Sequence, residues 1–206
     1  MTINLKNFLK DKQKLSKMGE FQELQEIDGL EISAVSADLY GSGRDDLALF
    51  YFKEGANYAA VYTNNSICSE SITWNKGLRK TSIKALMVNT KNANTFTGSQ
   101  GFEGVETLSK TLAKNLTLRE AQKKEGTTSV IKPNEILFAS TGVIGEKFPT
   151  QKIKECIPNL VEKLRDRQNK FIWFKSASSI MTTDTRPKLA FEELSLIHIS
   201  EPTRPY

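Results

Sequence analysis

ILFASTGVIGEKFPT, residues 136–150, is an apolar run that stops abruptly at two hydroxyl residues and a glycine. The segment Glu135–Ala139 is short and apolar, which predicts a buried strand. Gly142 lets the backbone turn with its N–H groups facing outward, and Thr141 adds a hydroxyl donor. Two donors aimed at one point stabilise an oxyanion, as acyl transfer requires. A simple strand-to-loop turn explains the same residues, and spacing alone favours that simpler interpretation.

The same stretch invites comparison with a phosphate-binding loop, because Gly142, Gly145 and Lys147 lie close together. The P-loop pattern is G-x-x-x-x-G-K-[ST]. Here only two residues separate the glycines, and Glu146 stands where the lysine belongs. A carboxylate at that position repels phosphate, so the loop is a weak match to this pattern.

Further strands and a helix are expected on the N-terminal side of this stretch. The runs 46–52 and 58–62 flank a Glu54-Gly55 turn and predict a hairpin. Residues 83–89 are apolar enough for a buried strand, whereas 90–98 show neither helical nor strand periodicity. A helix capped by Ser99 is expected next. Its buried face is predicted by apolar residues at helical spacing, namely Phe102, Val105, Leu108, Leu112 and Leu116.

The C-terminal side alternates polar loops with short helices. The polar, glycine-containing stretch 121–129 predicts a surface loop. Thr150 is expected to cap a short helix that ends at Cys156. Pro158 is expected to open a second helix, because a proline inside a helix removes a hydrogen bond. Strands and helices that alternate irregularly predict a layered α+β architecture.

Two polar clusters have more than one interpretation. Asn89, Asn92 and Asn94 follow the expected strand 83–89 and either bind a polar substrate or hold a loop through side-chain-to-backbone hydrogen bonds. The loop-holding role is favoured. The segment Met181-Thr-Thr-Asp-Thr185, within the polar junction 180–188, offers three hydroxyls and a carboxylate. Composition alone leaves open whether it is an ordinary turn or a binding segment.

The composition is that of a soluble globular protein. The chain has 206 residues, of which 38% are hydrophobic and 26% are charged, enough for one large domain or two small ones. The net charge of +5 comes from lysines scattered among glutamates, which indicates no nucleic-acid-binding face. Cys68 and Cys156 belong to no CxxC pair, which argues against a zinc site or a disulfide framework and favours a cytoplasmic location. No apolar run approaches the ~20 residues that a membrane span needs.

The two ends of the chain differ from its middle. Residues 1–27 are interpreted as an N-terminal extension whose apolar residues, spaced among lysines, predict an amphipathic helix docked on its own domain. LSLIHISEPTR, Leu194–Arg204, is similar to the translation of a transposon-end sequencing adapter. Residues 194–206 are therefore interpreted as an artefact tail, and the natural product is expected to continue beyond Glu193. The tail contains His198, the one histidine of the sequence, so no histidine-based chemistry or metal site is expected.

Three segments together resemble the glutamate N-acetyltransferase / ornithine acetyltransferase family of arginine biosynthesis: VNTKNANTFTGSQG (88–101), ASTGVIGEKFP (139–149) and IMTTDTRPK (180–188). The resemblance covers about residues 28–193, and residues 46–65 are similar to an early hairpin of the family. It implies an α+β sandwich with helices packed outside two β-sheets, incomplete in this chain. It also implies acetyl transfer from N-acetylornithine to glutamate without a cofactor, through an acetyl-threonine intermediate, with acetyl-CoA as a second donor in some members.

The resemblance assigns roles by position. Thr141 and Gly142 match the oxyanion-hole pair, and Thr182 matches a substrate-contacting threonine that Thr183 or Asp184 would support. The nucleophile is implied to be the N-terminal threonine of a β chain produced by self-cleavage. Residues 28–193 correspond to the α-chain portion, which lacks that threonine and is expected to be inactive alone; the intact enzyme is expected to be an α2β2 heterotetramer.

The chain departs from the family pattern in one loop, and two other functional classes remain. The family reads N-S-G-N-A-N where this chain has Asn89-Thr-Lys-Asn-Ala-Asn94. Lys91 disfavours the positive φ that glycine allows, so the loop is expected to differ locally. The alternative functions are a phosphate- or nucleotide-binding domain, which would release heat on titration with ATP, and a non-catalytic interaction module.

Overall fold

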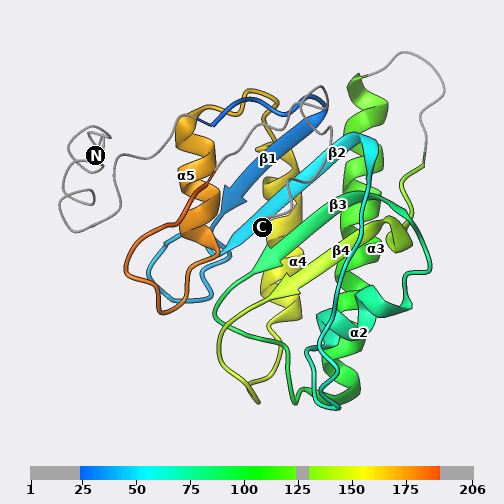
Figure 1. Cartoon of the computed structure of the whole chain (residues 1–206), viewed down its shortest axis with the longest axis vertical. Helices are drawn as coiled ribbons and strands as arrows, with labels where there is room; N and C mark the ends of the chain where they lie inside the picture. Colours follow the sequence, from blue (N-terminus) through cyan, green and yellow to red (C-terminus); the bar gives the residue numbers. More distant parts are fainter. Residues whose placement is uncertain (1–23, 124–129, 191–206) are drawn as a thin grey trace, which may run out of the picture.

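A four-stranded sheet forms the centre of the computed structural model, which describes residues 24–123 and 130–190 (Figure 1). The strand order is β1-β2-β3-β4; the first two pairs are antiparallel, and β3 and β4 are parallel. The strands are β1 (Leu30–Val35), β2 (Leu47–Asn57), β3 (Ser82–Asn89) and β4 (Ile136–Ser140). The helices are α2 (Glu70–Gly77), α3 (Gly98–Lys123), α4 (Thr150–Glu162) and α5 (Lys170–Ser179), with a short 3-10 helix at Pro133–Glu135. The predicted α+β class is confirmed, with one sheet in the described part of the chain.

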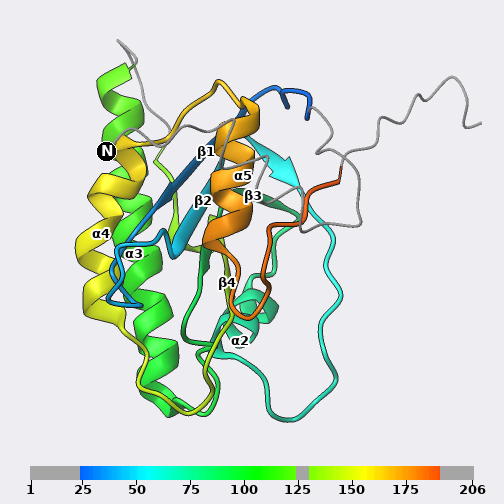
Figure 2. The same ribbon diagram turned by 90° about the vertical axis from the view of Figure 1, so that its left-hand side faces the viewer.

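Helices α3 and α4 cover one face of the sheet, and α5 lies on the other (Figure 2). Alternate strand residues point toward α3 and α4 and are almost wholly buried, among them Leu49, Met87 and Phe138. The predicted helical stripe meets them, because Val105, Leu108, Leu112 and Leu116 are fully buried and only Phe102 is half-buried. Each such apolar side chain contributes about 1.5–3 kcal/mol through burial. The principal core therefore lies between this face and the two helices.

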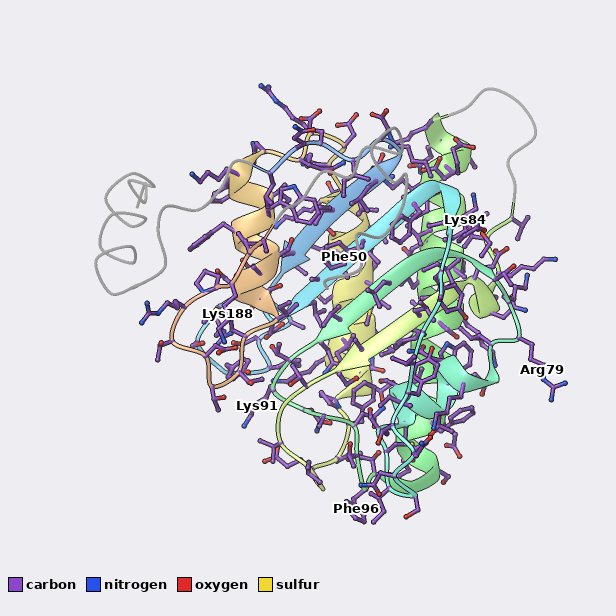
Figure 3. All side chains as sticks on the ribbon, in the orientation of Figure 1. Phe50, Arg79, Lys84, Lys91, Phe96 and Lys188 are labelled. Atoms are coloured by element: carbon purple, nitrogen blue, oxygen red, sulfur yellow. The ribbon has the colours of Figure 1, made fainter. Side chains whose placement is uncertain are left out.

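Among the described helices, α5 is the one that packs on the opposite face of the sheet, and it does so at the β1 side. Helix α5 packs there, and Trp173 contacts Phe50 with ring centroids 6.5 Å apart. Figure 3 shows Phe50 in the middle of this face. The apolar residues toward β4 stay half-buried: Phe52, Leu86, Val88 and Leu137. This partly covered surface is called the open sheet face below.

Both edges of the sheet have partners for their backbone. On β1, Ile32 exchanges two backbone hydrogen bonds with Arg165, at 3.0 and 3.1 Å. On β4, α2 supplies the partners: the Asn75 amide bonds the Phe138 backbone at both N–H and C=O, and Trp74 Nε1 donates to the Ile136 carbonyl at 2.9 Å. These contacts occupy backbone groups at both edges that would otherwise be open to another strand.

Glu31 is a buried carboxylate on β1, 1% exposed, and three basic residues neutralise it. Its oxygens lie 2.6 Å from Arg119, 3.0 Å from Lys123 and 3.3 Å from Lys53. Burial by itself raises the pKa of Glu31, but hydrogen bonds and charges from Lys123 and Arg119 outweigh it and hold the pKa below its ordinary value of 4.5. This cluster ties β1 to the C-terminal end of α3.

The predicted hairpin over residues 46–62 is wrong. Strand β2 continues through Glu54-Gly55 to Asn57, and its neighbours are β1 and β3. The register shifts between Tyr51 and Ala56, so a bulge absorbs the residues that were assigned to a turn. Residues 58–62 form no strand. Local alternation predicts a strand but not its partners, and here the partners are β1, earlier in the chain, and β3, later in it.

The helix boundaries around the two prolines also differ from expectation. Residues 150–162 form one helix with Pro158 inside it and Pro149 at its N-cap, so neither the cap at Thr150 nor the break is present. Proline costs about 3 kcal/mol within a helix, but Pro158 is exposed, and the buried side of α4 carries Ile153, Ile157, Leu160 and Val161. That packing keeps the helix continuous.

Helix α3 begins before and ends after its predicted limits. It starts at Gly98, so Ser99 lies within its first turn rather than at the cap, and it extends to Lys123 into the expected loop 121–129. Strands 83–89 and 135–139 are confirmed within one residue. The expected N-terminal helix falls mostly on residues 1–23, and the proposed tail lies at 194–206; both are outside the described residues.

Candidate functional site

The candidate site lies where the parallel strands β3 and β4 end side by side. Asn89 and Ser140 are register partners, and the pairing continues beyond them. Thr141 N–H donates to the Asn89 carbonyl at 3.1 Å, and Val143 N–H donates to the Lys91 carbonyl at 2.9 Å. The Val143 carbonyl in turn accepts from Ala93 N–H at 2.9 Å. The loops after the two strands therefore form one connected unit.

Gly142 occupies a position that no other residue can take without a local shift. Its φ is 138°, and a Cβ atom built on it would overlap the carbonyl of Lys91 and lie 2.5 Å from Asn92 N. The neighbouring loop thus approaches the Gly142 backbone more closely than any side chain permits. Close approach, together with the positive φ, is the structural reason for the glycine after β4.

Two adjacent donors remain available at this turn. Within residues 24–123 and 130–190, no acceptor bonds to the Gly142 N–H or to the Thr141 hydroxyl. Gly142 is exposed and Thr141 is half-buried, so neither residue is enclosed in the core. Their backbone is held by the ladder on both sides. Fixed, unpaired donors next to each other are what an oxyanion site requires.

A series of hydrogen bonds between hydroxyl and amide side chains fixes the end of β4. Ser140 Oγ donates to Asn89 Oδ1 at 2.7 Å and lies 2.6 Å from Ser71 Oγ on α2. Because the Ser140 proton is used toward Asn89, the Ser71 hydroxyl is the donor of that second bond. The sequence pattern did not single out Ser71 or Ser140 for this role, since Ser71 comes from a distant segment of the chain.

The three asparagines hold the loop, as the favoured interpretation predicts. Asn89 Nδ2 donates to the Asn92 carbonyl at 2.9 Å, and Asn92 Nδ2 donates to the Glu146 and Lys147 carbonyls at 3.1 and 3.2 Å. Asn94 Nδ2 bonds the Gly101 carbonyl at 3.2 Å. All three are buried, so their amide groups face the protein rather than solvent.

Thr182 lies on a different segment, the irregular stretch that follows α5. Arg44 anchors this stretch: its Nη2 donates to the carbonyls of Met181 at 2.7 Å and Ser178 at 3.2 Å, while its guanidinium stacks 4.4 Å from the Tyr40 ring centroid. Arg44 was not predicted from the sequence as a site residue. Figure 1 shows the segment after α5 at the end of the sheet where β3 and β4 finish.

The structure does not join Thr182 directly to Thr141 and Gly142, the predicted oxyanion pair. In the described part of the chain, no hydrogen bond connects Thr182 with Thr141 or Gly142. Thr183 and Asp184 are exposed, and Asp184 is paired with Lys188 at 2.6 Å. Asp45 is next to Arg44 in the chain. Burial raises the pKa of Asp45 above its ordinary value, and the nearby Lys175 ammonium offsets only part of that rise.

The loop does not have the arrangement of a phosphate cradle. Such a cradle turns successive backbone N–H groups toward the ligand. Here the N–H groups of Thr141, Val143 and Gly145 all donate to carbonyls of the neighbouring loop, the last to Thr95 at 2.9 Å. Helix α4 begins only at Thr150, after the exposed Lys147. The geometry therefore fits the binding of one small anionic centre better than that of a polyphosphate.

Other classes of site find little support in the described residues. No cluster of three or more His, Cys, Asp or Glu side chains in 24–123 and 130–190 is arranged to bind a metal ion. Over the same residues, no helix has the length and apolarity needed to cross a membrane.

Comparison with known proteins gives a consistent result. The ArgJ family model matches residues 31–203. The arginine biosynthesis bifunctional protein ArgJ of Gluconobacter oxydans is 34% identical over 175 residues, covering 84% of this chain and 37% of that protein. The protein of the same name from Neisseria meningitidis is 34% identical over 174 residues, covering 84% of this chain and 38% of its own length. The chain thus spans well under half the length of these curated relatives.

Solved structures agree in fold. A crystal structure of ornithine acetyltransferase from Mycobacterium tuberculosis, in complex with ornithine, superposes with a TM-score of 0.68 at 24% identity and covers 77% of this chain and 78% of that one. The arginine biosynthesis bifunctional protein ArgJ of Bacillus halodurans gives a TM-score of 0.66 at 23% identity, with 80% of both chains covered.

Proposed function

Because this chain belongs to the ArgJ family, we propose that it supplies the oxyanion-binding part of an acetyltransferase of arginine biosynthesis. The full enzyme would transfer an acetyl group from N-acetylornithine to glutamate. The observation that carries this proposal is the pair of unpaired donors, the Thr141 hydroxyl and the Gly142 N–H, at a turn held by backbone bonds to the neighbouring loop. Transfer through an acetyl-enzyme needs such donors in both half-reactions.

The proposed chemistry proceeds through an acetyl-threonine ester. A threonine hydroxyl of the complementary β chain attacks the acetyl carbonyl, and its proton passes to the threonine α-amine, whose unperturbed pKa is about 8. The carbonyl oxygen becomes negative and is held by Thr141 and Gly142. The intermediate collapses as the amine of ornithine leaves with a proton. Glutamate then attacks the ester through its amine, and the same donors hold the second oxyanion. The ester bond breaks as this intermediate collapses, and the threonine oxygen leaves with the proton that the glutamate amine gives up through the threonine α-amine. Acetyl-CoA, a thioester, would serve as an alternative donor in the first step.

The open sheet face supports a further part of the proposal, that a β chain packs on this α-chain portion. Phe52, Leu86, Val88 and Leu137 leave apolar surface half-exposed there, and apolar patches of this kind mark interaction sites. In the complete protein, a second sheet from the β chain would cover this face and bring the nucleophile to the oxyanion pair. Two such α/β units would form the α2β2 heterotetramer. The 206-residue chain alone would not catalyse acetyl transfer.

The test uses a full-length version in which residues 30–190 of this chain replace the equivalent segment of the Gluconobacter oxydans relative. N-acetylglutamate formation from N-acetylornithine and glutamate is measured by mass spectrometry, and self-cleavage is followed on a gel. Thr141→Ala should lower kcat about 100–1,000-fold, the cost of one oxyanion donor, while the two cleavage products remain. Thr141→Ser keeps the hydroxyl and should retain most activity.

The same version tests the substrate role of Thr182. Thr182→Ala should mainly raise KM, because it would remove a ground-state contact rather than an oxyanion donor. Thr81→Ala is the matched control, since Thr81 is exposed and lies just before β3, at the opposite end of that strand from the site, and should change neither constant. Near-normal turnover of Thr141→Ala would remove the oxyanion assignment, and unchanged kinetics of Thr182→Ala for both substrates would remove that residue from the site.

A further inference from the structure

Lys91 is held in a backbone conformation that disfavours a lysine. Its φ is 72°, in the left-handed region that glycine adopts freely and that residues with a Cβ atom adopt at a cost. A lysine disfavours a positive φ, yet the structure holds Lys91 in one. The Lys91 carbonyl accepts from Val143 N–H at 2.9 Å, which fixes the residue beside Gly142.

The ammonium group of Lys91 has no partner in the part of the chain that the structure describes. The side chain is half-buried, yet no carboxylate or other acceptor in residues 24–123 and 130–190 bonds to its Nζ. Two other half-buried lysines have acceptors: Lys84 Nζ donates to the Lys53 carbonyl at 2.7 Å, and Lys175 Nζ donates to the Ala34 carbonyl at 2.7 Å. A half-buried cation without a counter-charge attracts an anionic ligand.

The backbone of Lys91 lies directly beside the turn that carries Thr141 and Gly142. Figure 3 shows Lys91 at the end of the sheet where β3 and β4 finish, with its side chain directed away from the core. Lys188 lies at the same end but is neutralised by Asp184. Strained backbone conformations of single residues cluster at functional sites of proteins. At Lys91 the benefit would be a positive charge next to the two neutral donors.

We propose that the Lys91 ammonium binds the α-carboxylate of the acetyl donor, an inference that rests on the proposed function. In N-acetylornithine the carboxylate is attached next to the acetylated nitrogen, so a donor molecule whose acetyl oxygen reaches Thr141 and Gly142 also brings its carboxylate close to this turn. A flexible lysine stem can follow a carboxylate that shifts slightly between bound states. Lys91 is thus a substrate-binding residue at a position where the family pattern has glycine.

The experiment compares two ligands that differ only in the carboxylate. Binding of N-acetylornithine and of N-acetylputrescine, its analogue without the carboxylate, is titrated by NMR into the 206-residue chain. The unaltered chain should bind N-acetylornithine more tightly. Lys91→Gln should weaken the binding of N-acetylornithine about 5–10-fold, as expected for a partly exposed charge-assisted hydrogen bond. The affinity for N-acetylputrescine should not change. Lys91→Arg should retain the preference, and Lys147→Gln, an exposed lysine of the adjacent loop, should have no effect.

A second variant separates binding from structure. Lys91→Gly removes the strain of a side chain at positive φ, so it should raise the urea midpoint of unfolding. It should also weaken the binding of N-acetylornithine as much as Lys91→Gln does. A purely structural role would not move stability and affinity in opposite directions. Equal affinity of both ligands for the unaltered chain, or an unchanged ratio in Lys91→Gln, overturns the assignment of Lys91 and leaves the acetyl-transfer proposal in place. Failure of the unaltered chain to bind either ligand overturns the Lys91 site, and the proposed function is then judged by the turnover of Thr141→Ala alone.

Discussion

Gly142→Ala should destabilise this protein far more than the same change at Gly145, only three positions further along the loop. Both glycines have a positive φ, 138° and 81°. A Cβ atom on Gly142 would overlap the Lys91 carbonyl, whereas one on Gly145 would meet nothing within 4 Å. The pair therefore separates the cost of the backbone conformation from the cost of the close approach between two loops.

The expected magnitudes follow from the contacts. At Gly145, alanine costs about 1–2 kcal/mol for the left-handed backbone alone. At Gly142, a comparable strain of about 1–3 kcal/mol is joined by the loss of ladder hydrogen bonds, because the loop must move away from Lys91. The bonds at risk are those from Val143 to Lys91 and from Ala93 to Val143, both 2.9 Å long. Each contributes about 1 kcal/mol, so the total for Gly142→Ala is about 3–5 kcal/mol.

The measurement is urea unfolding of the 206-residue chain and its two variants, followed by circular dichroism at fixed pH and salt. Gly142→Ala should lower the free energy of unfolding by about 1–4 kcal/mol more than Gly145→Ala does, with the same denaturant slope. Equal losses for the two variants would show that the contact between the loops does not determine this glycine. The account of the oxyanion turn as a unit held by the neighbouring loop would then be wrong.

Two other changes test the supports of the fold. Glu31→Gln should cost about 2–4 kcal/mol at neutral pH, because it leaves Arg119 and two lysines without their buried counter-charge. The lowered pKa of Glu31 means that its contribution is present above the unfolded-state value of 4.5 and is lost as the pH falls through the lower folded-state value. The stability difference between the unaltered chain and Glu31→Gln should therefore shrink on acidification, and parallel pH curves would contradict this role. Pro158→Ala should raise the free energy of unfolding by about 1–3 kcal/mol, because it allows a backbone hydrogen bond at an exposed position inside α4. A lower melting temperature in calorimetry would argue that the proline fits the helix without cost.

Elements with strong local periodicity could be predicted from the sequence, and elements with weak periodicity could not. Helix α3 was predicted because its buried leucines repeat at helical spacing. Helix α5 was missed because its buried residues include Ser176, Ala177 and Ser179, whose small side chains give no apolar stripe. Strand β1 was missed because Glu31 and Ser33 interrupt its apolar pattern. A buried glutamate is tolerated there only because basic side chains from β2 and α3 meet it in the folded state.

The amino-acid sequence by itself determined which residues follow β4 and that they include a hydroxyl and a glycine, since these are properties of one short stretch. Only the tertiary structure decided why Gly142 must be glycine, which donors are left free, and that Lys91 stands beside them without a counter-charge. Those features depend on the parallel pairing of β3 with β4, which brings together loops that α3 separates along the chain. Local sequence patterns do not predict such an approach. Close steric contacts and unpaired hydrogen-bonding groups depend on which distant segments become neighbours in the folded chain.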